Sequence, residues 1–256
     1  KPSKKRILSR THAYHGTTYM AASLTGIASN NWQFDTLDLV THLSEANCYR
    51  RPEGMSEAEY CDHLVDELEQ TIDRLGADNI AAFIAEPIMG AGGVLVAPQG
   101  YHSCVQAICR ANDILFIADE VVTGFGRLGH FFASEAVFET QPDIINVAKG
   151  LSSGYAPLGA TLISDALYEV LSTPQGPGGV LSTGFTYSGH PVSCAAALKN
   201  IEIIEREGIC ENVREVGPYL ESKLKTLASH ETVGDIRGSH FMMAIENVAN
   251  KTTKEL

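Results

Sequence analysis

Short apolar runs alternate along the chain with longer segments whose apolar residues recur at helical spacing. Four runs have this character: "AAFIAEP" (81–87), "ILFIADE" (114–120), "DIINVAK" (143–149) and "GATLIS" (159–164). Nearly unbroken runs of this kind are typical of strands that are buried on both faces of a sheet. The segments between them predict helices over 58–76 and 101–112. This alternation predicts an α/β fold, in which helices cover both faces of a mainly parallel sheet.

The C-terminal part of the chain is organised differently. "HPVSCAAALKNIEIIERE" (190–207) predicts a long, closely packed helix, and a second helix is expected over 209–228. "ETVGDIRGSHFMMAIENV" (231–248) predicts a turn and a strand. We therefore expect a large domain over residues 1–215 and the beginning of a small α+β domain over 216–256. Because strand-like "RILS" begins at residue 6, earlier parts of the fold are expected to lie outside this chain.

Composition narrows the class of partner. The chain has 19 Lys and Arg against 31 Asp and Glu, a net charge of −12, which argues against nucleic-acid or anionic-membrane partners and favours small molecules. The six cysteines form no C-x-x-C pair, so we expect reduced thiols and a cytoplasmic location. No run approaches the roughly 18 apolar residues of a membrane span, and the basic first segment lacks the apolar region of a signal peptide.

Two adjacent carboxylates, Asp119 and Glu120, end the apolar run 114–120. In a parallel α/β sheet, functional residues gather at the carboxyl ends of the strands. Apolar residues followed by Asp-Glu also match the Walker B pattern of nucleotide triphosphatases. That site needs G-x-x-x-x-G-K-[ST], and the sequence contains no Gly-Lys dipeptide. A solvated strand end without a ligand is the remaining alternative.

Lys149 ends the run 143–149 and is followed by Gly150. Taken alone, a lysine at this place is most often a side chain that reaches to solvent. If its strand lies close to that of Asp119, however, an amine and a carboxylate meet at one edge of the sheet. A desolvated lysine can form a Schiff base, and a buried carboxylate needs a cationic partner. Pyridoxal 5'-phosphate supplies an aldehyde for the amine and a pyridinium N–H for the acid.

The histidines do not indicate a metal site. His12 and His15 have a spacing that metal ligands can have, but no companion cysteine or carboxylate pair completes a site. The H-E-x-x-H pattern does not occur either. We therefore expect no metal.

Five motifs, in order along the chain, resemble those of the class III aminotransferases among the fold-type I pyridoxal-phosphate enzymes. They are "AYHG" (13–16), "AEPIMGAGG" (85–93), "LFIADEVVTGFGRLG" (115–129), "INVAKGLSSGYAPLGA" (145–160) and "GFTYSGHP" (184–191). Together they cover nearly the whole chain and are most similar to the omega-amino acid and amine:pyruvate transaminase branch. The resemblance implies a three-layer α/β/α sandwich as the large, cofactor-binding domain.

The resemblance implies two catalytic residues. Lys149 is expected to form the Schiff base with pyridoxal 5'-phosphate and later to move a proton between the substrate carbon and the cofactor. Asp119 is expected to pair with the pyridine nitrogen. Glu120, on the other side of the strand end, is expected to make structural contacts instead.

The resemblance also implies which residues surround the cofactor ring. Tyr14 is expected to stack on one ring face, in a loop whose residues His15 and Gly16 also belong to the cofactor site. Val122 is expected to pack against the opposite face, and Glu86 to lie near the ring in a supporting role.

Thr186 lies just before the helix expected near Pro191, and backbone N–H groups at a helix start suit a phosphate. In the family that this chain resembles, the matching threonine reaches the phosphate of the cofactor in the partner subunit. The resemblance therefore implies a homodimer, and leaves open whether two dimers form a tetramer.

Three positions bear on the substrates. Relatives of the ornithine and 4-aminobutyrate type carry a glutamate in the stretch matching "MGAGG", where this chain has Ala91, and tend to have Gln where Val122 stands. Both differences favour a monocarboxylate acceptor such as pyruvate, with an amine or omega-amino acid as donor. Thr17 falls where amine-pocket residues lie in this branch. The alternatives are a 2-oxoglutarate-dependent transaminase, an aminomutase, or a truncated protein that is not catalytic.

Two parts of the family's site are not found in this sequence. In the family, a Gly- and Ser-rich phosphate cup lies upstream of "YHG", and an arginine that binds the substrate carboxylate lies in the C-terminal domain, beyond residue 256. We therefore expect the chain to be part of a longer enzyme, and turnover to require the complete protein.

Overall fold

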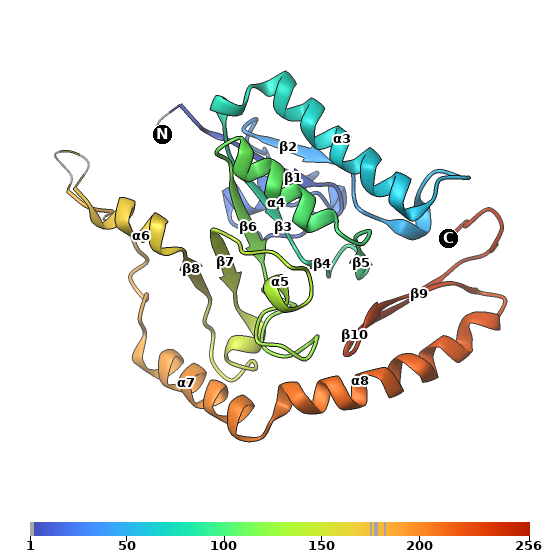
Figure 1. The fold of residues 1–256 in the computed structure, drawn as a ribbon. Coiled ribbons are helices and arrows are strands. Elements are labelled where there is room, and N and C mark those ends of the chain that lie inside the picture. Colours follow the sequence, from blue (N-terminus) through green and yellow to red (C-terminus); the bar gives the residue numbers. More distant parts are fainter. Residues whose placement is uncertain (1–2, 175, 177–178, 182) are drawn as a thin grey trace.

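A six-stranded sheet forms the centre of the structure, a computed structural model that describes residues 3–174, 176, 179–181 and 183–256 (Figure 1). The strands lie in the order β2-β1-β3-β6-β7-β8. The first five are parallel to their neighbours, and β8 pairs antiparallel with β7. They span Val40–Leu43 (β2), Arg6–Arg10 (β1), Ile80–Ala85 (β3), Leu115–Asp119 (β6), Ile144–Val147 (β7) and Ala160–Ile163 (β8). The predicted α/β fold with a mainly parallel sheet is confirmed.

Helices α3 (Glu57–Leu75) and α4 (Tyr101–Ala111) cover one face of the sheet (Figure 1). α3 begins with a capping box, in which Ser56 Oγ accepts from the Glu59 N–H and the Glu59 carboxylate accepts from the Ser56 N–H. It ends at Leu75, and the next residue, Gly76, has a φ of 80°, a conformation that favours glycine. The core between these helices and strands β1, β3 and β6 contains fully buried apolar side chains, including Leu8, Leu64, Leu68, Phe83 and Val105.

The opposite face begins with α1 (Tyr19–Leu24), which contacts β1 and β2. Successive residues of a strand point to opposite faces: Leu8 enters the core beneath α3, whereas the Ser9 hydroxyl donates to the Leu24 carbonyl at 2.7 Å. Helices therefore lie on both faces of the sheet.

The remaining elements surround this centre. They are α2 (Ala28–Asn31), the short hairpin β4 (Ile88–Met89) and β5 (Leu95–Val96), α5 (Ala133–Ala136), α6 (Asp165–Ser172), α7 (Pro191–Arg206), α8 (Ile209–Lys225), the antiparallel pair β9 (Val233–Ser239) and β10 (Met242–Asn247), and the 3-10 turns η1 (Cys48–Arg50), η2 (Ala77–Asn79), η3 (Lys149–Leu151) and η4 (Thr226–Ser229). No described helix has the length and apolar character needed to cross a membrane.

One expectation about the strands is wrong. The run 159–164 was expected to be buried on both faces, but all four residues of β8 are exposed, with Leu162 at 41% and Ile163 at 38% of their full surface. The physical reason is position, because β8 is the last strand in the sheet order. Similarly, α7 packs through one side only, and Val192 and Leu198 on that helix are exposed.

The boundary expected at residue 215 stays a prediction. α8 continues through residues 215 and 216 without interruption. The segment 231–248, where one strand was expected, forms the hairpin of β9 and β10, and β9 contacts β5.

His102 of α4 is a buried histidine that bears on stability. Its Nε2 lies 3.0 Å from the carbonyl oxygen of Pro87. Burial, with a smaller contribution from the nearby Arg10 guanidinium, lowers the pKa of His102 to about 3. The imidazole is therefore neutral in the folded protein at a pH where the unfolded chain would bind a proton.

We predict that His102 makes the fold sensitive to acid. The unfolded chain binds this proton near pH 6.5, so the free energy of unfolding should fall as the pH drops below about 6.5, by at most about 1.4 kcal/mol per pH unit. His102→Gln should weaken this dependence between about pH 6 and about pH 4, as measured by urea unfolding. His63→Gln, at an exposed position of α3, should keep the wild-type slope. Parallel profiles for His102→Gln and wild type would contradict the prediction.

Candidate active site

Three adjacent strands end at one edge of the sheet, and each delivers a candidate residue there. β3 is followed directly by Glu86, β6 ends at Asp119, and β7 is followed by the turn η3 that begins at Lys149. β3, β6 and β7 are neighbours in the sheet, and Asp119 lies in register with Asn146. The parallel sheet therefore gathers two carboxylates and an amine at its carboxyl edge.

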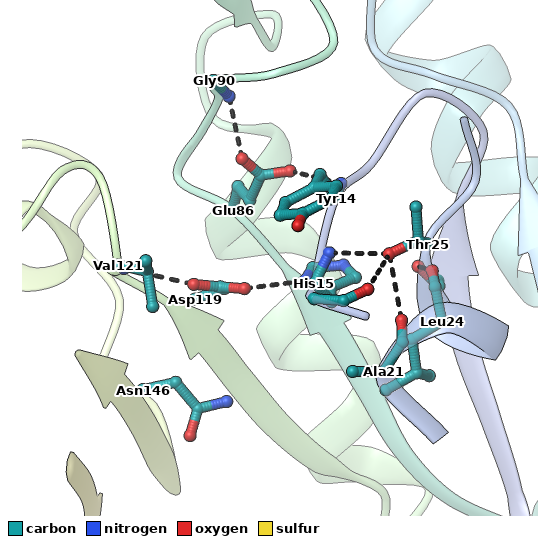
Figure 2. Close-up of polar contacts among 12 residues, drawn as sticks. Tyr14, His15, Ala21, Leu24, Thr25, Glu86, Gly90, Asp119, Val121 and Asn146 are labelled. Carbon is teal, nitrogen blue, oxygen red and sulfur yellow. Dashed lines mark hydrogen bonds and ion pairs between the residues drawn. The ribbon is translucent and has the colours of Figure 1, made fainter. Parts of the chain in front are cut away.

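Asp119 is buried and is held through both carboxylate oxygens (Figure 2). Oδ2 lies 2.8 Å from His15 Nδ1, and Oδ1 accepts a hydrogen bond of 3.1 Å from the Val121 N–H. The His15 side chain is 2% exposed, and its backbone N–H donates to Thr25 Oγ1 at 3.0 Å. His15 therefore ties the loop that follows β1 to the end of β6.

The other ring nitrogen of His15 adds to this picture. Nε2 is buried and has no hydrogen-bond partner among the described residues. If Nδ1 carries the proton and donates to Asp119, Nε2 is an acceptor. The pairing between His15 and Asp119 was not expected from the sequence, in which 104 positions separate the two residues.

Glu86 is buried between two loops, and its carboxylate accepts hydrogen bonds from the Tyr14 N–H at 3.0 Å and the Gly90 N–H at 2.8 Å (Figure 2). Burial raises the pKa of Glu86, although both N–H groups favour the ionised form. The loops also touch directly, since a Cβ on Gly92 would lie 2.5 Å from the His12 carbonyl oxygen. Glu86 thus holds Tyr14 at the edge where Asp119 lies.

Glu120 makes structural contacts, as expected. It is fully buried, and its carboxylate accepts hydrogen bonds from Thr123 Oγ1, the Ala133 N–H, and both the N–H and Oγ of Ser134, at 2.6–3.0 Å. These contacts fasten the turn after β6 to the start of α5. The two acids therefore have different hydrogen-bond partners, and of the two it is Asp119 that contacts His15.

Lys149 occupies a strained turn. Its φ of 35° lies in the left-handed region, which residues other than glycine rarely adopt. A Cβ on the next residue, Gly150, would lie 2.9 Å from Phe125 Cβ and 3.0 Å from the Gly124 carbonyl oxygen. The lysine turn thus packs against the turn that follows Asp119, and only glycine fits at residue 150.

A cavity of about 840 Å³ adjoins this region. Of the predicted site residues, Lys149 and Val122 line it, together with Gly90 and the cationic Arg127. Residues Phe241, Met242 and Met243, from the turn before β10 and from β10 itself, form a further part of the lining. These three were not predicted as site residues; the only signal was the apolar run that they form after Ser239 and His240.

The remaining predicted residues lie in loops. Thr17 and Ala91 are exposed, in the segments that follow His15 and Gly90. Gly16 has a φ of 123°, and a Cβ there would lie 3.1 Å from Ala21 Cβ. Thr186 is exposed in the segment before α7, between the exposed rings of Phe185 and Tyr187. Among the described residues, no three His, Cys, Asp or Glu side chains gather in a way that could hold a metal.

The full chain, residues 1–256, matches the family described as Aminotransferase class-III. The chain belongs to the class III aminotransferases. It is 42% identical over 251 residues to a diaminobutyrate–2-oxoglutarate transaminase of Halomonas elongata, covering 96% of this chain and 53% of that protein. It is 43% identical over 256 residues to a putrescine–pyruvate aminotransferase of Pseudomonas aeruginosa, covering 99% of this chain and 55% of that protein.

The fold of this chain is also similar to solved transaminase structures. An (S)-enantioselective omega-transaminase from Thermomicrobium roseum has a TM-score of 0.93 at 44% identity, with 99% of this chain and 56% of that chain covered. A structure described as a transaminase with L-ala has a TM-score of 0.96 at 44% identity, with 99% and 60% covered. The chain thus spans about half the length of the curated relatives that it matches.

We predict that Glu120→Gln destabilises this aminotransferase fold. Four donor contacts surround the carboxylate, and an amide NH₂ would point a donor at a donor. The free energy of unfolding should fall by about 2–3 kcal/mol, measured by urea unfolding. Glu205→Gln, at an exposed position of α7, is the matched control and should change it by less than about 0.5 kcal/mol. Equal effects of the two substitutions would contradict the structural role.

Proposed function

We propose that the protein transfers an amino group from an amine or omega-amino acid to a 2-oxo acid, with pyridoxal 5'-phosphate held by Lys149 and Asp119. The observation that carries the proposal is the convergence of a buried, hydrogen-bonded carboxylate and a lysine at neighbouring strand ends. Family membership supports the transaminase class. The choice of substrates and the roles of single residues are our inference.

The residues at this edge fit the cofactor. A carboxylate offers about four acceptor positions, and Asp119 receives hydrogen bonds from His15 and Val121 only, among the described residues. It therefore retains capacity for the N–H of a protonated pyridine ring. Gly150 and Gly92 allow the backbone segments around the edge to approach closely.

When bound, pyridoxal 5'-phosphate supplies an aldehyde that captures amines and a ring that stabilises negative charge at the neighbouring carbon. Asp119 would hold the protonated ring nitrogen, and the contact with His15 Nδ1 would fix the orientation of the Asp119 carboxylate. The Lys149 amine would hold the cofactor aldehyde. The same amine would take a proton from the substrate carbon and return it on the cofactor side.

The neighbouring residues orient the ring. Tyr14, whose backbone is fixed by Glu86, would stack on one face of the ring, with His15 and Gly16 beside it. Val122 would pack on the other face, and it lines the same cavity as Lys149. Glu86 would support this arrangement through its hydrogen bond with the Tyr14 N–H, rather than by reacting itself.

We propose pyruvate as the acceptor. Ala91 stands where dicarboxylate-handling relatives carry glutamate, and Thr17 lies in the loop proposed to line the amine pocket. One observation favours the alternative, 2-oxoglutarate, because Arg127 lines the cavity beside Lys149 and could pair with a second carboxylate. The relatives named above include both acceptor types.

We also propose a homodimer in which Thr186 reaches the cofactor phosphate of the partner subunit. Large aromatic side chains are exposed around this segment, with Tyr155 at 89%, Phe185 at 88% and Tyr187 at 81% of their full surface, and such groups are enriched in interfaces. A cytoplasmic location is supported by six free cysteines.

Lys149→Ala tests the proposed chemistry. The complete gene product, loaded with pyridoxal 5'-phosphate, should show a visible absorption band that borohydride removes, leaving the cofactor mass on the peptide that contains Lys149. The variant should lack the band and lose turnover by on the order of 10²–10⁴-fold. Lys199→Ala removes an exposed lysine of α7 that pairs with Glu202, and should leave both unchanged. An unaltered band in Lys149→Ala would refute the assignment.

Acceptor preference can be measured on the complete gene product with one amine donor and two acceptors. If pyruvate is the acceptor, its kcat/KM should exceed that of 2-oxoglutarate by about tenfold or more, equivalent to about 1.4 kcal/mol. This result requires that Arg127 does not pair with the second carboxylate of 2-oxoglutarate. A preference for 2-oxoglutarate that disappears in Arg127→Gln would favour the alternative.

A further inference from the structure

The turn that carries Lys149 is held by one side chain of α7. Asn200 Nδ2 donates hydrogen bonds to two successive backbone carbonyls of this turn, Gly150 at 2.8 Å and Leu151 at 3.1 Å. One amide group thus bridges the two residues that directly follow the lysine. Nothing in the sequence distinguishes Asn200 from the other polar residues of this helix.

The turn needs such support because its backbone is strained. Lys149 has a φ of 35°, and strained conformations persist only where the surrounding structure holds them. Gly150 lies so close to the turn after Asp119 that a Cβ would contact Phe125 and Gly124. The lysine turn also contacts α7, where Asn200 is a polar partner.

Apolar packing also joins α7 to this turn, but it has less directional effect. Leu151 and Val147 pack with Ala197, and Ile201 of α7 packs against the same cluster. Hydrophobic contact is non-directional, whereas hydrogen bonds to carbonyl oxygens constrain angle as well as distance. The apolar cluster therefore brings α7 and the turn together, whereas the two Asn200 hydrogen bonds constrain the orientation of the carbonyl groups after Lys149.

We propose that Asn200 is the positioning residue for Lys149, and that it couples the lysine to the segment before α7. The same helix begins at Pro191, shortly after Thr186, so a shift of α7 would be transmitted to both residues. The proposal rests on the function proposed for Lys149. Asn200 itself does not touch the reacting atoms and acts through the turn.

The two carbonyls require a donor, which defines the variants. Asn200→Asp keeps the shape but turns oxygen atoms toward the carbonyl oxygens, and Asn200→Leu keeps similar volume without donors. Asn200→Gln retains the NH₂ on a longer side chain and should partly restore function. Asn112→Asp is the matched control, because the Asn112 amide also donates to a backbone carbonyl, that of Ile108 at 2.9 Å, at the end of α4.

The experiment uses the complete gene product with pyridoxal 5'-phosphate at saturation. For Asn200→Asp and Asn200→Leu we expect a kcat lowered by about 10- to 100-fold, as misplacement of a reacting group causes. We also expect an increased isotope effect for a substrate deuterated at the reacting carbon, because proton transfer by a displaced Lys149 becomes rate-limiting. The pH at which the visible band changes should shift. Asn200→Gln should lie between these variants and wild type, and Asn112→Asp should match wild type in all three measurements.

Melting of the cofactor-free protein separates positioning from stability. If Asn200→Asp, Asn200→Leu and Asn200→Gln lower only the melting temperature, with kcat, isotope effect and band as in wild type, Asn200 is merely structural and the proposal fails. If the wild-type protein shows no band, the function proposed for Lys149 fails first. A normal wild-type band together with unaltered Asn200 variants would overturn this inference alone.

Discussion

The register between β6 and β7 is the constraint on which the rest of the site depends. Parallel pairing sets Asp119 beside Asn146, so the chain leaving β7 brings Lys149 to the edge where β6 ends. A slip of one residue would exchange the faces of Asp119 and Glu120. The core secures β6 against such a slip, because Phe116 lies in register with Phe83 and their rings stack 6.2 Å apart beneath α3 and α4.

The adjacent acids Asp119 and Glu120 are both buried, but they differ in how many hydrogen bonds their carboxylates accept. A carboxylate has about four acceptor positions. Glu120 accepts four hydrogen bonds from Thr123, Ala133 and Ser134. Its carboxylate therefore links the turn after β6 to the start of α5. Asp119 receives only two contacts among the described residues, one of them from His15. The incompletely satisfied acid is the one that can still receive a ligand.

Two separate segments of the chain contact the lysine turn. Gly150 permits close approach to Gly124 and Phe125, and the Asn200 amide holds the carbonyls from α7. The candidate site is thus built from the ends of strands, with loops and a helix fixing their direction.

The sequence by itself determined the elements β3, β6, β7, α3 and α4, because the spacing of apolar residues is a local property, and its motifs indicated the family and the importance of Asp119 and Lys149. Tertiary structure alone decided what those residues contact. An apolar run does not distinguish an edge strand from a central one, so the exposure of β8 was missed. His15 meets Asp119, and Asn200 meets the lysine turn, only because sheet order and helix packing join distant segments.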